Sequence, residues 1–479
     1  MVFHNINNRI AFFVSSIFLL CLTYFISREN FILFLCPFVL SVFYLAIWRI
    51  RYLFYTVIFF TPFSMSLQEL GVDFNGFDMA FPTEPILLGF MILVMLNVIY
   101  RFHLFKQIIK HPVFTIMMLY LLWMFVTCLT STMPQTSLKL FLTRLWYILP
   151  IFFLGVFFLK EKINFLNFTL FYTIPFSMVI MYTTLRHSLY LFDKQSAHYM
   201  MSPFFNDHTS YGAMIAFFIP LLIASLWSQK KNRLVQFAIV GVIFLFLVGL
   251  VLSFSRAAWI SLICAFFVML LVRLRLSIKS LLSLGLILLI FGFFFQSTII
   301  SQLSNNRQDS SNNLLEHFNS LSNISTDASN MERINRWKCA IDMFKERPFV
   351  GWGPGTYQFQ YAPFQFSADK TIISSNDGDA GNAHSEYLSV LSESGVLGLV
   401  FFITLLGIVF IRIISLYNMV HDPDIKRWLL AILTSLLSYF IHGLFNNFLD
   451  TDKASVAIWA VIAIVVSIDL ANNKNKLPN

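Results

Sequence analysis

Charged residues are scarce in this chain of 479 residues. Asp, Glu, Lys and Arg together make up 12% of it, whereas hydrophobic residues make up 58% and Phe alone occurs 57 times. Such a composition excludes a soluble protein of two or three domains. Apolar runs of about 20 residues, the length that crosses a bilayer, recur from one end of the sequence to the other. We therefore predict an all-α, polytopic bundle of transmembrane helices.

Cysteine is also rare, and its placement argues against two kinds of site. Four of the five cysteines lie inside apolar runs, and Cys339 stands alone in a polar segment. Their spacing indicates neither a disulfide nor a metal site. We expect no metal and no cofactor in this protein. Small residues typical of a signal-peptide cleavage site do not follow the first apolar run, which we expect to be retained as a span.

Apolar runs qualify as candidate spans at residues 9–26, 31–47, 51–66, 84–100, 112–130, 138–159, 164–182, 208–227, 234–252, 256–272, 280–298, 386–411, 428–446 and 454–470. Basic residues such as Arg101, Lys160 and Arg273 lie in every second connection, and the alternate connections are acidic or neutral. The positive-inside rule then places both termini in the cytoplasm. The formal charge of +9 has the same origin, so we expect no nucleic-acid partner.

Two connections on the outer side are long, covering residues 183–207 and 299–385. Loops of such length are uncommon unless they are functional or disordered. Residues 302–329 are rich in Ser and Asn, and we expect them to be mobile. Across residues 331–344 apolar side chains recur at helical spacing, which predicts an amphipathic helix on the outer membrane surface that ends at Pro348.

Two arginines interrupt apolar runs, where a charge is costly. Arg144 lies in the middle of its predicted span, where it either binds an anion in a polar cavity or pairs with a carboxylate or carbonyl to lock the bundle. Because its own span offers no acid, we favour the anion. Arg256 lies at the outward end of a predicted span. That position suits either a phosphate near the headgroups or a snorkelling interfacial arginine.

Arg333 and Arg336 lie on the predicted surface helix. Guanidinium groups bind phosphate oxygens two at a time, so two or three converging arginines would make a pyrophosphate site without a metal. For Arg336 we favour a simpler interpretation, in which it belongs to a solvated or headgroup-binding face.

His384 lies where the longest polar segment meets a long apolar run, within Asn382-Ala383-His384-Ser385. An imidazole at this boundary could exchange a proton near neutral pH for a substrate that is half sugar and half lipid. The alternative is an ordinary histidine satisfied at a helix end. Asp207 and His208 could form a second polar contact, but we favour a helix cap before the next span.

Two acidic patterns point weakly to metal-dependent transferases. Asp377-Gly378-Asp379 is similar to the Asp-x-Asp signature of many sugar transferases. Nucleotide sugars are not available outside the cytoplasm, so we favour a flexible loop there. Asp73 and Asp78 lie in an early outer loop. They leave open the alternative of a membrane transferase in which acidic residues of that loop bind a metal ion.

Three stretches resemble the O-antigen ligase and polymerase superfamily of bacterial membrane glycosyltransferases. They are His384-Ser385 with Gly395 and Gly398; Arg256 to Ile260, where Ile260 replaces a Leu of the family pattern; and Arg333 to Trp337, followed by Pro348 and the turn cluster Gly351-Trp352-Gly353-Pro354-Gly355. The large outer loop lies between the second and last elements, as the family requires. The resemblance covers roughly residues 205 to 400.

The resemblance implies a metal-independent, inverting glycosyl transfer at the periplasmic face of the bacterial inner membrane. The donor would be a glycan on undecaprenyl pyrophosphate, and the acceptor would be lipid A-core or another glycan. The assigned site residues are His384 as the base that takes a proton from the acceptor hydroxyl; Arg144, Arg256 and Arg333 for the pyrophosphate; and Asn382, Ser385, Asp207 and His208 as support.

The sequence leaves other functions open. The closest rival is a repeat-unit polymerase that uses the same donor. Transfer to a protein is a further option, against which the short tail after residue 470 argues. A flippase or transporter is a more distant alternative, because no inverted repeat is visible.

With about 12–14 spans in all, we expect N-terminal helices in 1–204, central ligase-like helices in 205–298, a periplasmic loop with short helices in 299–385 and C-terminal helices in 386–479.

Overall fold

A computed structural model describes residues 35–71, 78–228, 232–276, 328–367 and 381–474, with isolated positions between them. The chain divides into two compact units, residues 1–57 and 58–479. Several predictions lie outside the described residues: the spans at 9–26 and 280–298, most of the Ser- and Asn-rich segment 302–329, Asp73, and the Asp377–Asp379 motif.

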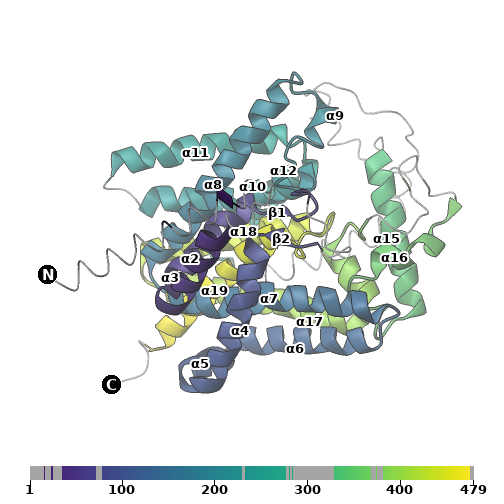
Figure 1. Ribbon diagram of the computed structural model, residues 1–479, viewed down its shortest axis with the longest axis horizontal. Coiled ribbons are helices and arrows are strands. Elements are labelled where there is room, and N and C mark those ends of the chain that lie inside the picture. The colour runs from purple at the N-terminus through teal and green to yellow at the C-terminus, as the bar shows by residue number, and fades with distance from the viewer. Residues whose placement is uncertain are drawn as a thin grey trace. The chain divides into compact units, whose positions relative to one another are not determined.

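Helices make up nearly all of the described structure (Figure 1). They are α2 Leu35–Trp48, α3 Ile50–Phe60, η2 Thr61–Phe63, α4 Thr83–Tyr100, α5 Phe102–Ile109, α6 Pro112–Leu129, α7 Pro134–Phe158, α8 Lys162–Ser188, α9 Lys194–Ala197, α10 His208–Ser228, α11 Arg233–Leu252, α12 Arg256–Arg273, α15 Ala328–Glu346, α16 Tyr357–Gln360, η3 Ala362–Phe364, α17 Glu386–Met419, α18 Pro423–His442 and α19 Asp452–Lys474. Two-residue strands β1 (Met65–Ser66) and β2 (Ala80–Phe81) pair antiparallel. The prediction of an all-α chain is confirmed for the described part.

Nine of the described helices are long and apolar enough to cross a membrane: α4, α6, α7, α8, α10, α11, α12, α17 and α19. Most begin and end within a few residues of the predicted spans. One span is corrected. The predicted span 51–66 ends as an α-helix at Phe60, because Pro62 has no N–H to donate to the next helical turn, and the chain continues as the 3-10 turn η2.

The candidate spans differ in how deeply they are buried. In α10 and α19, 89% of the apolar stretch is buried, against 22% in α11. α10 packs against α11, α12 and α18, α19 packs against α7, and α17 packs against α6 (Figure 1). Exposed large apolar side chains such as Phe237 and Phe244 point outward from α11. α10 and α19 therefore belong to the interior, and α11 presents an apolar face of the kind that suits lipid.

A break near the start of α17 receives the turn that follows α15. Gly395 has φ 69° and ψ −171°, which no residue in a helix adopts. The N–H of the next residue, Val396, donates to the carbonyl of Pro348 at 2.9 Å. On the other side of this contact Gly351 has φ 68°, and its N–H donates to Arg347. The predicted glycine turn thus allows close backbone approach, and the partner it approaches is a helix.

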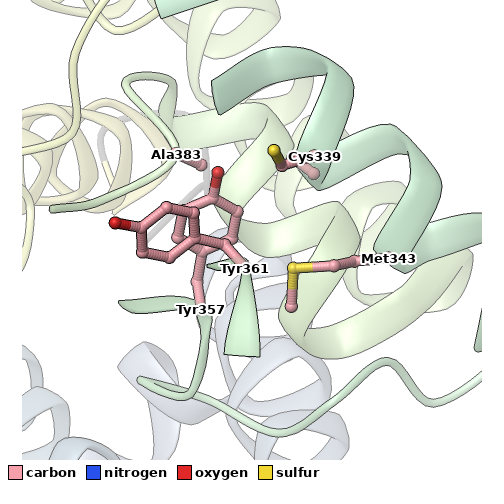
Figure 2. Close-up of a cluster of buried hydrophobic side chains, with 6 residues drawn as sticks. Cys339, Met343, Tyr357, Tyr361 and Ala383 are labelled. Carbon is pink, nitrogen blue, oxygen red and sulfur yellow. The ribbon is translucent and has the colours of Figure 1, made fainter. Parts of the chain in front are cut away.

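The helix predicted over residues 331–344 is present as α15, but its buried face differs from the predicted one. Cys339, Ala340 and Met343 are fully buried and form one cluster with the stacked rings of Tyr357 and Tyr361. Figure 2 shows Cys339 and Met343 beside the two rings. Trp352 donates its indole N–H to the carbonyl of Met343 at 2.9 Å. Ile341, which was expected on the apolar face, is 39% exposed. α15 is therefore packed against the loop that follows it and against α17.

Arg336 requires a correction. We expected a solvated or headgroup-binding face, yet Arg336 is only 4% exposed. Its Nε donates to Glu332 Oε1 at 2.7 Å, and its guanidinium lies 3.8 Å from the centroid of the Tyr361 ring. Burial opposes ionisation of Glu332, but hydrogen bonds from Ser374 and Arg336 prevail and lower its pKa. The buried cation is thus matched by an anion one turn away and by an aromatic face.

The α17 break yields a stability prediction. A Cβ on Gly395 would lie 2.1 Å from the carbonyl oxygen of Phe349, and the positive φ adds strain. We expect Gly395→Ala to destabilise the protein by more than about 2 kcal/mol. Gly407→Ala on the same helix is the control, because a Cβ there meets nothing within 4 Å. It should be neutral or stabilising by up to about 1 kcal/mol. Thermal unfolding in detergent compares them, and equal midpoints would contradict the packing described.

The buried ion pair of α15 gives a second stability prediction. Glu332→Gln or Arg336→Gln leaves one charge buried without its counterion, which should cost about 3–5 kcal/mol. The double variant should recover part of this loss. The exposed pair Asp342–Lys345, on the same helix with Lys345 68% exposed, is the control. Lys345→Gln should change stability by less than about 0.5 kcal/mol. Equal losses from Arg336→Gln and Lys345→Gln in thermal unfolding would show that Arg336 is not buried.

Candidate active site

His384 is fixed in an unusual backbone conformation just before α17. Its φ is +47°, in the left-handed region that residues with a side chain rarely adopt. Its N–H donates to Asn382 Oδ1 at 2.9 Å, and its carbonyl accepts the indole N–H of Trp337 at 3.1 Å. The Ser385 hydroxyl accepts from the N–H of Leu388 and caps α17. Two predicted supporting residues, Asn382 and Ser385, therefore hold the backbone on either side of the imidazole.

The imidazole of His384 is partly buried and carries a perturbed pKa. Its Nδ1 is enclosed and has no hydrogen-bond partner among the residues that the structure describes. Burial, followed by the positive charges of Arg333 and Arg336, lowers the pKa of His384 to about 4. Burial and nearby cations both disfavour the imidazolium. At neutral pH the ring is therefore uncharged and has a lone pair that can accept a proton.

Three other predicted site residues, Arg333, Asp207 and His208, belong to the surroundings of this imidazole. Arg333 on α15 and Asp207 before α10 lie close enough for their charges to act on His384. The charge of Arg333 also reaches His208, the first residue of α10. Asp207 Oδ1 accepts the N–H groups of Thr209 and Ser210, each at 2.7 Å. The prediction that Asp207 caps the next helix is thereby confirmed.

The start of α12, where Arg256 is the first residue, lies beside the start of α10. His208 Nδ1 is 2.8 Å from the carbonyl oxygen of Ser253, three residues before Arg256. Gly212 of α10 is so close to this turn that an added Cβ would lie 2.9 Å from the Ser253 hydroxyl. The starts of α10 and α12 are therefore in contact, and they bring Arg256 into the neighbourhood of His208.

Arg144 is not part of this group. It is 6% exposed in the middle of α7, and its Nε donates to Asp450 Oδ1 at 2.6 Å. Its Nη1 donates to the hydroxyl of Tyr120 on α6. Pairing with a carboxylate was the alternative we favoured less, and the acid comes from the connection between α18 and α19. Asp450 links Arg144 to the cavity described next.

A polar cavity of about 320 Å³ lies near His384, which does not itself line it. Asn382 and Asp207, which both adjoin the histidine, are among its lining residues. Its other acidic lining residues are Asp78, Glu84, Asp450 and Asp452, and it also contains Lys453. Arg144, Arg256 and Arg333 do not line it. The described residues thus place arginines and carboxylates in different parts of the surroundings of His384.

Two buried glutamates of α17 were missed by the sequence analysis. Glu386 Oε1 accepts the N–H groups of Phe448 and Leu449, both at 2.8 Å, and the hydroxyl of Tyr439. Glu393 accepts the N–H of Tyr357 at 3.1 Å. Both acids follow His384 within a long apolar run. An acid within such a run is a signal that could have found them.

Comparison with known proteins bears on part of the chain. Residues 241–403 match the family model described as O-antigen ligase. This stretch contains Arg256, Arg333 and His384, whereas Arg144, Asp207 and His208 lie outside it. No curated protein matches the chain. The family consists of glycan-transferring membrane enzymes of the ligase and polymerase type. The predicted resemblance is therefore confirmed for residues 241–403, which match the O-antigen ligase family.

Proposed function

We propose that this protein is a ligase that transfers a glycan from undecaprenyl pyrophosphate to lipid A-core at the periplasmic face of the bacterial inner membrane. The observation that carries the proposal is the partly buried imidazole of His384, whose Nδ1 is enclosed and which lies near Arg333 within the stretch that matches the ligase family. A polymerase, which would use the same donor with a second lipid-linked glycan as acceptor, is the alternative that the test below separates.

In the proposed reaction the acceptor hydroxyl attacks the anomeric carbon of the donor sugar. His384 takes the hydroxyl proton as the new carbon–oxygen bond forms. The bond between the anomeric carbon and the phosphate oxygen breaks, and undecaprenyl pyrophosphate leaves with the bonding electrons. A single displacement inverts the anomeric carbon. Arg256 and Arg333 would stabilise the charge that develops on the leaving oxygen.

Arg144 and Arg336 would contribute differently to this reaction. Arg336 is engaged with Glu332 and Tyr361, so we assign it an electrostatic effect on His384 and a role in holding α15. Arg144 is engaged with Asp450, so it would contact pyrophosphate only by exchanging that carboxylate for phosphate oxygens. Arg256 and Arg333 lie within the stretch that matches the ligase family, whereas Arg144 lies outside it. For that reason we rank Arg256 and Arg333 ahead of Arg144 as pyrophosphate ligands.

Donor binding would also tune the base. The positive charges of Arg333 and Arg336 contribute to the low pKa of His384. A bound pyrophosphate neutralises such charge and thereby raises the pKa of the imidazole. A general base works best when its pKa lies near the working pH. The donor would thus convert a weak base into a stronger one at the moment when a proton has to be removed.

The same proposal includes an orientation in the membrane. Basic residues in alternate connections support cytoplasmic termini. His384, α15 and the rest of segment 299–385 would then face the periplasm. The helices in 1–204, 205–298 and 386–479 would form the membrane part around it. A lipid-linked donor presented at the outer leaflet could reach such a site without leaving the bilayer.

A complementation experiment tests the function. Cells lacking the native protein receive wild type, His384→Ala or the control His421→Ala, an exposed histidine in the connection between α17 and α18. We expect wild type and the control to restore long glycan chains on lipid A-core. We expect His384→Ala to accumulate long chains on the undecaprenyl carrier, because the acceptor is no longer deprotonated. Lipopolysaccharide gels and a blot for lipid-linked glycan give the readout.

The other outcomes of that experiment have definite meanings. If His384→Ala leaves only single repeats, attached or lipid-linked, the protein is a polymerase. If the variant is stably produced and still attaches long chains, His384 is not the base and the proposed mechanism is wrong.

A pH profile tests the state of the base. Because burial and the arginine charges disfavour the imidazolium, the free enzyme should keep a neutral base until pH falls to about 4. We expect kcat/KM for transfer by purified protein to stay level between pH 7 and about 5 and to fall about tenfold for each pH unit below about 4. As pH is lowered, kcat should begin to fall at a higher pH than kcat/KM does, because the bound donor raises the pKa of His384.

Arg333→Gln is the matched variant for this experiment. It removes a positive charge that lowers the pKa of His384, so its kcat/KM profile should shift to higher pH. A wild-type kcat/KM that falls through pH 6.5, with no shift in Arg333→Gln, would contradict this account of the base.

A further inference from the structure

We infer that the polar cavity beside His384 is a saccharide subsite for the acceptor, and that it selects a neutral or amine-bearing sugar over an anionic one. This inference rests on the proposed transferase function in one respect, because only that function makes the bound sugar the acceptor of a transfer. The cavity, its chemistry and its position stand on the structure.

The position of the cavity relates it to the acceptor. Asn382 lines the cavity, and its Oδ1 accepts the N–H of His384. Asp207 also lines the cavity, and its charge acts on the imidazole. Arg256 and Arg333, the proposed pyrophosphate ligands, do not line it. His384 does not line the cavity either, so the acceptor hydroxyl would reach the imidazole from a sugar held in the cavity next to Asn382, while the donor phosphates would lie with the arginines.

The size and the lining of the cavity suit a short stretch of glycan. Its volume of about 320 Å³ is at the small end of the range for ligand pockets, which is roughly 300–1,000 Å³. Amides and hydroxyls on the wall come from Asn206, Asn382, Asn447 and Thr451, and aromatic faces come from Phe204, Phe205 and Phe448. Asn447 Oδ1 has no hydrogen-bond partner within the described part of the chain. Such a wall offers acceptors for sugar hydroxyls and apolar surface for the sugar ring.

The charges on the wall give the selectivity. Five carboxylates and one ammonium group line the cavity. Asp450 pairs with Arg144, Asp452 pairs with Lys453, and Glu84 accepts the hydroxyl of Tyr147. Among the described residues Asp78 and Asp207 have no ion-pair partner. Asp207 caps α10, but neither carboxylate is neutralised by a paired cation, so both repel an anion in a recess and accept hydrogen bonds from hydroxyl or ammonium groups.

The test measures saccharide binding directly, without relying on transfer. The probes are methyl glucoside, methyl glucosaminide and methyl glucuronide at millimolar concentration, with saturation-transfer NMR on full-length protein in nanodiscs. For wild type we expect the glucosaminide and the glucoside to bind and the glucuronide to bind at least about tenfold more weakly.

Three variants make this test specific. Asp78→Asn removes one charge from the cavity without changing the size of the side chain. It should narrow the difference in affinity between the glucoside and the glucuronide. Asn447→Asp adds a carboxylate to the cavity and should widen this difference in affinity. The test therefore remains decisive if Asp78→Asn fails to fold. Glu161→Gln changes the net charge equally at an exposed position outside the cavity and should change nothing.

The outcomes separate this inference from the proposed function. Equal binding of glucoside and glucuronide, no effect of the two cavity variants, or no binding of any probe would overturn the saccharide subsite, even if transfer is observed in cells. Selective binding that follows the variants would support the subsite. If cells then show no glycan transfer of any kind, the ligase proposal fails while the subsite stands.

Discussion

Two buried carboxylates on the first turns of α17 hold the loops around His384 in place. Glu386 accepts N–H groups from the α18–α19 connection, and Glu393 accepts one from the loop that follows α15. In an apolar bundle, N–H groups of irregular backbone have no water to bind, and leaving them unsatisfied is costly. A carboxylate that accepts them removes this cost at both loops. The helix that follows the histidine is therefore also the anchor of its surroundings.

The other buried charges follow the same rule of compensation. Arg144 is matched by Asp450 and Tyr120, and Arg336 is matched by Glu332 and Tyr361. Pairs of this kind add little net stability, but losing one partner is expensive. They therefore act as constraints on geometry. Each pair joins segments that the site needs together: α7 with the cavity wall, and α15 with the loop carrying Tyr361.

Helix positions could be predicted because the length of an apolar run and its flanking charges determine them locally. The span expected at 208–227 is α10 at His208–Ser228, and the one expected at 234–252 is α11 at Arg233–Leu252. Side-chain partners could not be predicted in this way. Asp450 is 306 residues from Arg144, and no local pattern links them. The buried face of α15 was predicted wrongly because Glu332, Asn335 and Arg336 are buried together and form hydrogen bonds with one another. Hydrophobic spacing alone does not reveal such a polar buried face.

The backbone of His384 shows how the same constraints serve chemistry. A left-handed conformation at a non-glycine residue persists only where its surroundings determine it strongly. Here Asn382 fixes the N–H, Trp337 fixes the carbonyl, and the Ser385 cap begins a helix that Glu386 ties to the next loop. All of these contacts are made within the protein itself. The fold thereby fixes the imidazole near Arg333 and near the carboxylate-lined cavity. In the proposed reaction, a base held in this way would need little reorganisation.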